Sequence, residues 1–118
     1  MTIKPRATLS WVRLKPDTAY SPMTIEEFRA TLGDSEPPAV APLVRAMWHA
    51  ARGNWDEAHR IAQDINDHYG AWVHAHLHRL EGDLGNARYW YGHAAQPEAT
   101  DSIEAEWERI ATELLRSS

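Results

Sequence analysis

Two short segments of the chain share one pattern: a glycine, a capping residue, an apolar residue, two further residues and an alanine. Residues 53–58 read GNWDEA, and residues 82–87 read GDLGNA, 29 positions later. A glycine can adopt the left-handed backbone conformation that ends a helix, and Asn or Asp directly after it favours the start of another. A small alanine one turn into that second helix permits close packing. The pattern predicts two tandem antiparallel helix pairs.

Helix-start signals on either side predict flanking helices that cap the two pairs. Thr24 and Glu27 have the spacing of a capping box, and this helix should end at Gly33. Asp101 and Glu104 have the same spacing before an amphipathic C-terminal helix. The helices between them are expected to end at Gly53, Gly70, Gly82 and Pro97. The expected inner face of the helix that begins after Asp83 consists of Leu84, Ala87, Tyr91 and Ala94. The sequence therefore predicts an all-α fold of six helices.

Charge and proline content divide the chain into two parts. Residues 1–22 contain three prolines and are expected to form an extended basic arm, whereas residues 23–118 should form a single helical domain. Residues 1–16 carry four basic side chains and no acid, a charge of +4. Because the net charge of the chain is −5, residues 17–118 carry −9. An acidic body argues against a nucleic-acid partner. Trp11 and Leu14 could pin the arm to the body or reach a second subunit.

The absence of cysteine narrows the chemistry of the chain. It excludes disulfides, thiolate catalysis and cysteine-ligated metals, so a metal site would need histidine and carboxylate ligands. No run approaches the roughly 18 apolar residues of a membrane span, and the N-terminus lacks the apolar stretch of a secretory signal. We therefore expect no membrane partner and a cytoplasmic location. With no nucleophile beside a base and no phosphate-binding loop, we expect neither enzymatic activity nor a cofactor.

Residues 40–97 resemble two short, divergent tetratricopeptide repeats. Ala87 and Tyr91 match the Ala-x3-aromatic signature of that family's second helix, and Pro97 lies where the family often closes a repeat. The resemblance implies a concave face, lined by the first helix of each pair, that binds a protein partner or a second copy of the chain. The residues that it assigns to this face are Tyr69, Trp72, His76, Arg79 and Met47. The alternative is that these residues pack beneath the flanking helices.

Histidine is frequent, with seven residues in 118, and supports an alternative function in binding a metal or a small ligand. His74 and His78 are one helical turn apart, a spacing that lets two imidazoles share one metal ion. Asp64, His49 or His59 could supply a further ligand. The alternative is that these are ordinary surface or partly buried histidines. Tyr89 and Trp90 could likewise stack on a ligand or join their helix to its neighbours.

Overall fold

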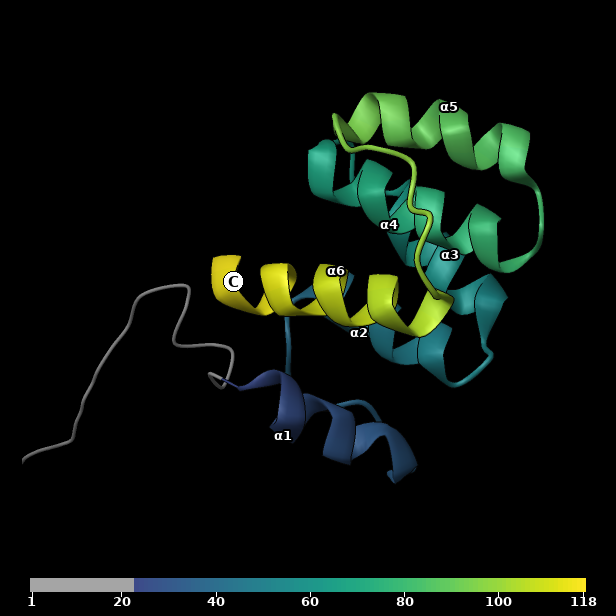
Figure 1. The fold of residues 1–118 in the computed structure, drawn as a ribbon. Helices are drawn as coiled ribbons and strands as arrows, with labels where there is room; N and C mark the ends of the chain where they lie inside the picture. The colour runs from purple at the N-terminus through teal and green to yellow at the C-terminus, as the bar shows by residue number, and fades with distance from the viewer. Residues whose placement is uncertain (1–22) are drawn as a thin grey trace, which may run out of the picture.

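The computed structural model describes residues 23–118 and shows an all-helical protein (Figure 1). In this part of the chain there are six α-helices, one short 3-10 helix (η2) and no β-strand. The elements are α1 (Ile25–Ala30), η2 (Thr31–Gly33), α2 (Pro42–Ala51), α3 (Trp55–Gln63), α4 (His68–Leu80), α5 (Leu84–Ala94) and α6 (Ile103–Ser117). The predicted all-α class is confirmed, whereas the predicted arm lies outside the described residues. None of the helices within residues 23–118 has the length and apolar character needed to cross a membrane.

The two glycine turns join α2 to α3 and α4 to α5. Gly53 and Gly82 have φ values of +80° and +85°, which side-chain-bearing residues rarely adopt. Asp83 caps α5 by accepting a hydrogen bond from the N–H of Asn86, but the Asn54 side chain makes no such bond at α3. Ala58 and Ala87 are fully buried, as expected for small residues where helices approach closely.

The flanking helices begin with side-chain caps. The capping box of Thr24 and Glu27 is present at α1, so this prediction is confirmed. At α6 the cap is Ser102, which accepts a hydrogen bond from the N–H of Ala105, and the prediction of Asp101 is wrong by one residue. The Asp101 carboxylate instead pairs with Arg109, with 2.6 Å between the closest nitrogen and oxygen.

Gly70 lies inside α4, which corrects the prediction that it ends the preceding helix. α3 ends at Gln63, and Asp67 caps α4 by accepting a hydrogen bond from the N–H of Gly70 at 2.8 Å. A Cβ atom at position 70 would lie 1.9 Å from the carbonyl oxygen of Ile65. Glycine is needed here because the backbone of the α3–α4 connection passes so close to the helix.

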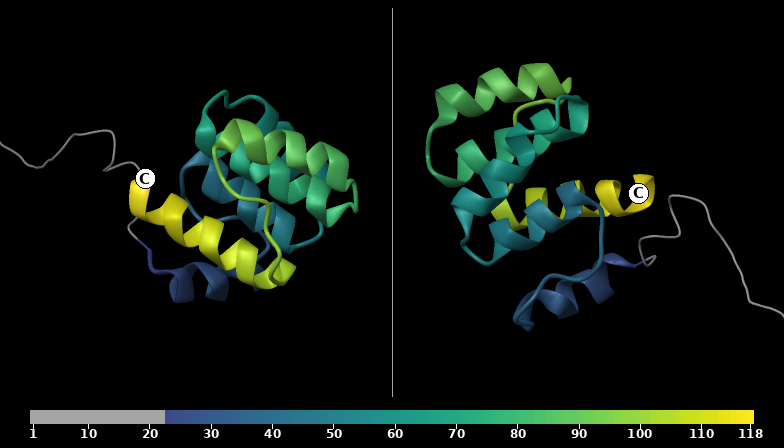
Figure 2. Two further views of the ribbon diagram at one scale, coloured as in Figure 1. Left: turned by 45° about the horizontal axis from the view of Figure 1, so that its top comes forward. Right: turned by 180° about the vertical axis from the view of Figure 1, so that it is seen from behind.

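The α6 helix contacts α1, α2 and α4 and closes the core (Figure 2). Its Trp107 ring stacks on Phe28 of α1, with ring centroids 5.8 Å apart, and its indole N–H donates to the carbonyl oxygen of Met47 in α2 at 2.8 Å. The buried hydrophobic residues form one cluster to which all six α-helices contribute. α6 therefore holds α1 against the rest of the molecule.

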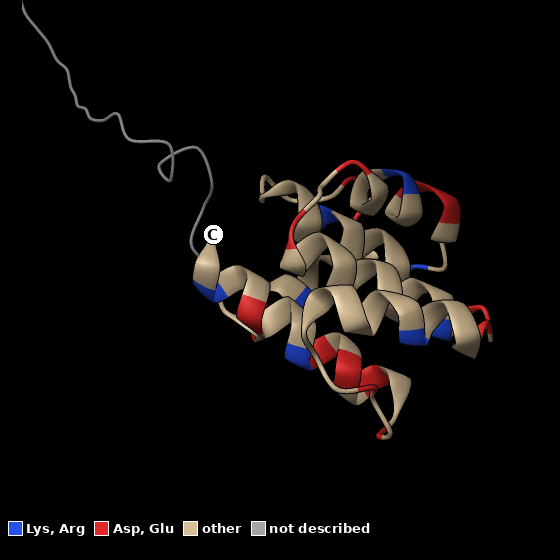
Figure 3. Ribbon diagram, turned by 90° about the horizontal axis from the view of Figure 1, so that it is seen from above, with Lys and Arg blue, Asp and Glu red and all other residues tan. Residues whose placement is uncertain are grey.

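The surface of the described residues mixes acidic and basic side chains (Figure 3). Arg29 of α1 and Glu108 of α6 form one of the exposed ion pairs, at 2.6 Å. Leu84 is 49% exposed, so its predicted place on the inner face of α5 is wrong, whereas Tyr91 and Ala94 are buried as predicted. As the first residue of α5, directly after the glycine turn, Leu84 lies beyond the packed part of the helix.

Candidate metal site between α3 and α4

His74 and His78 lie one turn apart on α4, with their rings side by side. The ring centroids are 4.9 Å apart and the ring planes are inclined by 21°. Both side chains are almost fully buried, at 7% exposure. The pairing follows directly from the helical period, which brings residues four positions apart onto one face.

The third histidine comes from α3. The Nε2 atoms of His59 and His74 are 2.9 Å apart, and the ring centroids of His59 and His78 are 5.5 Å apart. One potential ligand atom from each of the three residues lies within 4.8 Å of the other two. Of the candidates that the sequence offered, the structure therefore brings His59 to the pair. His49 and Asp64 do not belong to this cluster.

The separation of the His59 and His74 nitrogens is close to that of two imidazoles bound to one metal ion. Zinc binds histidine nitrogen at about 2.0–2.1 Å, and tetrahedral geometry then separates the ligand nitrogens by about 3.3 Å. The separation between His59 and His74 needs only a small increase to accommodate such an ion. We define His59, His74 and His78 as the histidine cluster.

Glu81 fixes the orientation of one of these rings. The Nδ1 atom of His78 lies 2.9 Å from Oε1 of Glu81, so the Nδ1–H donates to the carboxylate and Nε2 keeps its lone pair. Metal-bound histidines usually donate their second ring nitrogen to a carboxylate or carbonyl in this way, which sets the tautomer and strengthens the ligand. Nε2 is therefore the ring nitrogen of His78 that keeps a lone pair for an ion.

Two tryptophans pack on the other rings of the cluster. Trp55 stacks on His59 with centroids 4.6 Å apart, and Trp90 stacks on His74 at 4.0 Å. The Trp55 indole N–H in turn donates to the carbonyl oxygen of Leu77 in α4. These contacts place an indole face against each imidazole, and Trp90 joins α5 to α4 through its stacking on His74.

Burial lowers the pKa values of two imidazoles of the cluster, those of His59 and His74. It lowers the pKa of His74 to about 4, together with repulsion from His59 and His78. Burial also lowers the pKa of His59, with a further contribution from repulsion by His78. Only neutral imidazole offers a lone pair to a metal, so proton release would not oppose binding at these two residues at pH 7.

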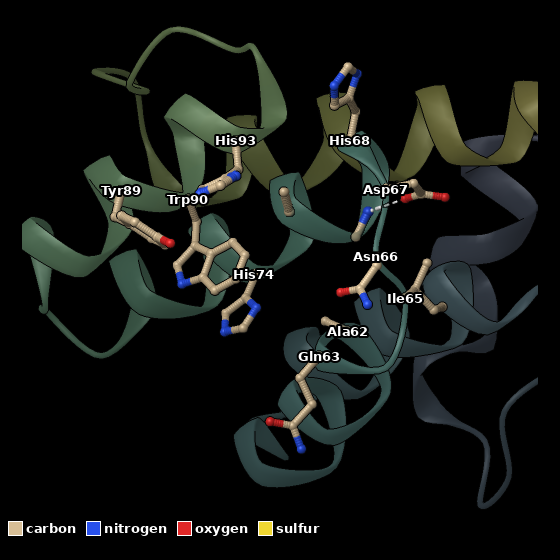
Figure 4. Close-up of a pocket in the computed structure, with 12 residues that line it drawn as sticks. Ala62, Gln63, Ile65, Asn66, Asp67, His68, His74, Tyr89, Trp90 and His93 are labelled. Atoms are coloured by element: carbon tan, nitrogen blue, oxygen red, sulfur yellow. Dashed lines mark hydrogen bonds between the residues drawn. The ribbon is translucent and has the colours of Figure 1, made fainter.

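A cavity of about 360 Å³ adjoins the cluster (Figure 4). His74 and Trp90 form part of its wall, and Tyr89 and His93 of α5 lie beside them. The opposite wall is the α3–α4 connection, residues 65–67, with the first turns of α4. The cavity therefore lies between α5 and the α3–α4 connection, beside the cluster.

The residues expected on a concave binding face lie mostly in the interior. Met47, Trp72 and His76 are 0%, 7% and 1% exposed, whereas Tyr69 is 36% exposed and the Arg79 side chain 15%. α6 packs over the faces of α2 and α4 that carry them. Only Tyr69, and Arg79 in part, are accessible to a partner in this arrangement.

Sequence reasoning missed the buried carboxylate of Glu106 and the side chains that donate hydrogen bonds to it. This fully buried carboxylate of α6 accepts hydrogen bonds from His76 of α4 at 2.8 Å, Arg79 at 3.0 Å and the hydroxyl of Tyr91 in α5. Its position offered a signal, because it lies four residues before Ile110, within the apolar stripe of an amphipathic helix. A charged residue on such a stripe requires buried partners.

The chain was compared with protein-family models, with curated proteins and with solved structures, and no match was found in any of the three comparisons.

Proposed function

We propose that the protein binds a divalent transition-metal ion, zinc in the first instance, through the imidazoles of His59, His74 and His78. The observation that carries this proposal is the convergence of three ring nitrogens from two helices within 4.8 Å. Imidazole is a preferred ligand of zinc, copper and nickel, and a three-histidine set is well known for zinc.

Two further observations support an ion at this position. The Glu81 carboxylate orients His78 through its second ring nitrogen, an arrangement typical of metal-bound histidine. Burial also makes the imidazoles of His59 and His74 harder to protonate. Without an ion, one of the facing Nε2 atoms can donate a hydrogen bond to the other, and an ion would replace this bond.

The test is a zinc titration of the full chain, expressed without a histidine tag, by isothermal calorimetry. We expect one ion per chain and, at free zinc 100 times the dissociation constant, a gain of about 2.7 kcal/mol in the free energy of unfolding. Replacing His59, His74 or His78 by Ala should abolish this binding. Glu81→Ala should weaken it by about 10- to 100-fold, because it removes the partner that orients His78.

His49→Ala is the matched control for His59→Ala. Both histidines are half-buried on neighbouring helices, but His49 lies outside the cluster. Its substitution should leave zinc affinity unchanged. Equal losses in the two variants, or a wild-type chain that takes up no zinc, would refute the proposal.

The sequence-based hypothesis of a non-enzymatic protein-interaction module, with a tetratricopeptide-like arrangement of the two helix pairs, stays a prediction. The packing of α2 with α3 and of α4 with α5 supports the paired-helix part of it. A binding face would have to use Tyr69 and the accessible part of Arg79. A homodimer formed through that face is part of the same prediction.

A further inference from the structure

We infer that Trp55 is a positioning residue of the histidine cluster, and that by holding His59 close to α4 it restricts the site to small divalent transition-metal ions. The inference rests on the proposed function, because it concerns which ions the three imidazoles would accept. Zinc, cobalt, nickel and copper belong to the favoured class. Cadmium, an ion of the same charge but larger radius, does not.

His59 is the proposed ligand whose place depends on packing between helices. His74 and His78 both belong to α4, so the helical period fixes their spacing. Both are also almost fully buried, whereas His59 belongs to α3 and is only half-buried. The distance between His59 and the other two histidines therefore depends on what holds α3 against α4.

Trp55 of α3 connects His59 to α4. Its indole lies on the ring of His59, with centroids 4.6 Å apart and planes inclined by 12°. Its N–H donates a hydrogen bond to the carbonyl oxygen of Leu77 in α4, at 2.6 Å. The same indole meets the ring of His78 at an angle of 64°, with centroids 5.8 Å apart. One side chain thus contacts two proposed ligands and the backbone of the helix that carries the other pair.

The two glycine turns differ at the position of Trp55. Leu84 is the equivalent residue of the second turn, since each is the second residue after the glycine. Leu84 is 49% exposed, and the helix that it begins is capped by Asp83. At α3 the Asn54 side chain makes no capping hydrogen bond, and Trp55 instead bonds to the neighbouring helix. This contact is therefore particular to the helix that carries His59.

The spacing of the imidazoles relates this contact to the size of the ion. The Nε2 atoms of His59 and His74 are 2.9 Å apart, whereas a tetrahedral zinc ion separates its nitrogen ligands by about 3.3 Å. A larger ion forms longer bonds and needs a wider separation. Widening would move His59 away from α4, against the stacking and the hydrogen bond of Trp55. Because site geometry contributes to metal selectivity, Trp55 should favour ions with short metal–nitrogen bonds.

The test compares zinc and cadmium, each titrated by calorimetry into the full chain without a histidine tag. Trp55→Leu removes both the indole face and the N–H. We expect it to weaken zinc binding by about tenfold, as loss of a residue that orients a ligand does, and to weaken cadmium binding less. The ratio of cadmium affinity to zinc affinity should therefore rise. A general loss of stability would weaken both ions alike and leave this ratio unchanged.

Trp48→Phe is the matched control for Trp55→Phe. The indole N–H of Trp48 also donates to a backbone carbonyl, that of Thr31, at 3.2 Å, but this bond joins α2 to η2. Trp48→Phe should leave the affinity ratio at its wild-type value. Trp55→Phe keeps an aromatic face over His59 and should give a ratio between those of wild type and Trp55→Leu.

Circular dichroism establishes that each variant is folded, and Trp55→Phe decides the matter if Trp55→Leu is not. An unchanged ratio in the folded Trp55 variants, while His59→Ala still abolishes zinc binding, would overturn the inference and leave the metal proposal intact. An equal rise in Trp48→Phe would also overturn it. A wild-type chain that binds neither ion would overturn both proposals.

Discussion

At the scale of single residues, the buried carboxylate of Glu106 connects three helices. It accepts hydrogen bonds from His76 and Arg79 of α4 and from Tyr91 of α5, while the residue itself belongs to α6. A buried carboxylate is tolerated only when charged and polar partners replace the water that it loses. Removing the carboxylate would therefore deprive all three donors of a buried acceptor.

We expect Glu106→Gln to lower the free energy of unfolding by about 3–5 kcal/mol, the range for removing one member of a buried ion pair. The amide replaces one accepting oxygen of the carboxylate by an N–H₂ donor and removes the negative charge that pairs with Arg79. Chemical denaturation measures the change. The control is Glu108→Gln, which removes an exposed carboxylate paired with Arg29 and should change stability by about 0–1 kcal/mol.

The difference in the free energy of unfolding between wild type and Glu106→Gln should also depend on pH. Burial raises the pKa of Glu106, but the hydrogen bonds from His76, Tyr91 and Arg79 outweigh it, so the net pKa lies below the ordinary value. The stabilisation is therefore complete above the ordinary carboxylate pKa of about 4.3 and is lost as pH falls through the lower folded-state value. The stability difference between wild type and Glu106→Gln should shrink at low pH; a constant difference would contradict this account.

The sequence could predict parts of the site that depend on one helix. Helical spacing places His74 and His78 on one face whatever surrounds them. The choice of His59 over the other candidates depends on how α3 packs against α4, which local sequence does not specify. The burial of Met47 likewise depends on α6, a helix distant from it in the chain.

At the scale of elements, Gly70 explains why the predicted end of the helix before α4 is wrong. Glycine is common both after the last turn of a helix and where two backbones approach closely. The second reason applies here, because the carbonyl oxygen of Ile65 occupies the space of a side chain. The two cases differ only in the path of the α3–α4 connection, and sequence pattern alone does not reveal that path.

Gly70→Ala and Gly92→Ala should change stability in opposite directions. Alanine in a helix is usually more stable than glycine by about 1 kcal/mol, and Gly92 of α5 has no atom within 4 Å of the added Cβ, so that variant should gain stability. At Gly70 the clash should instead lower stability by about 1–3 kcal/mol, as overpacking does. Thermal or chemical denaturation distinguishes them, and a gain at both positions would contradict the close approach.

At the scale of the whole molecule, α6 holds the structure together across the longest sequence separation. Trp107 contacts Phe28 near the start of the described residues and Met47 in the first helix pair. The sequence indicated the apolar stripe of α6 but not its partners, since amphipathic spacing identifies a buried face without specifying what covers it. The predicted helices on either side of the two pairs are present, and the prediction that they cap the pairs stays a prediction.

We expect Trp107→Ala to lower the free energy of unfolding by about 3–5 kcal/mol, because it removes a large buried side chain and leaves a cavity. Hydrogen exchange should then be fastest in α1, which loses its stacking contact with α6. Tyr89→Ala is the control. Its side chain is 59% exposed, so stability should change by less than about 0.5 kcal/mol. A similar loss in both variants would show that α6 does not anchor α1 in this way.

The contact between His59 and His74 has a further consequence for a chain that contains no cysteine. An ion held by both residues would close a loop of 15 residues, much as a disulfide would. In the chain-entropy account, a cross-link of that length restricts the unfolded chain by about 3 kcal/mol. The histidine cluster would then act as a reversible cross-link, made and broken by the supply of metal rather than by oxidation.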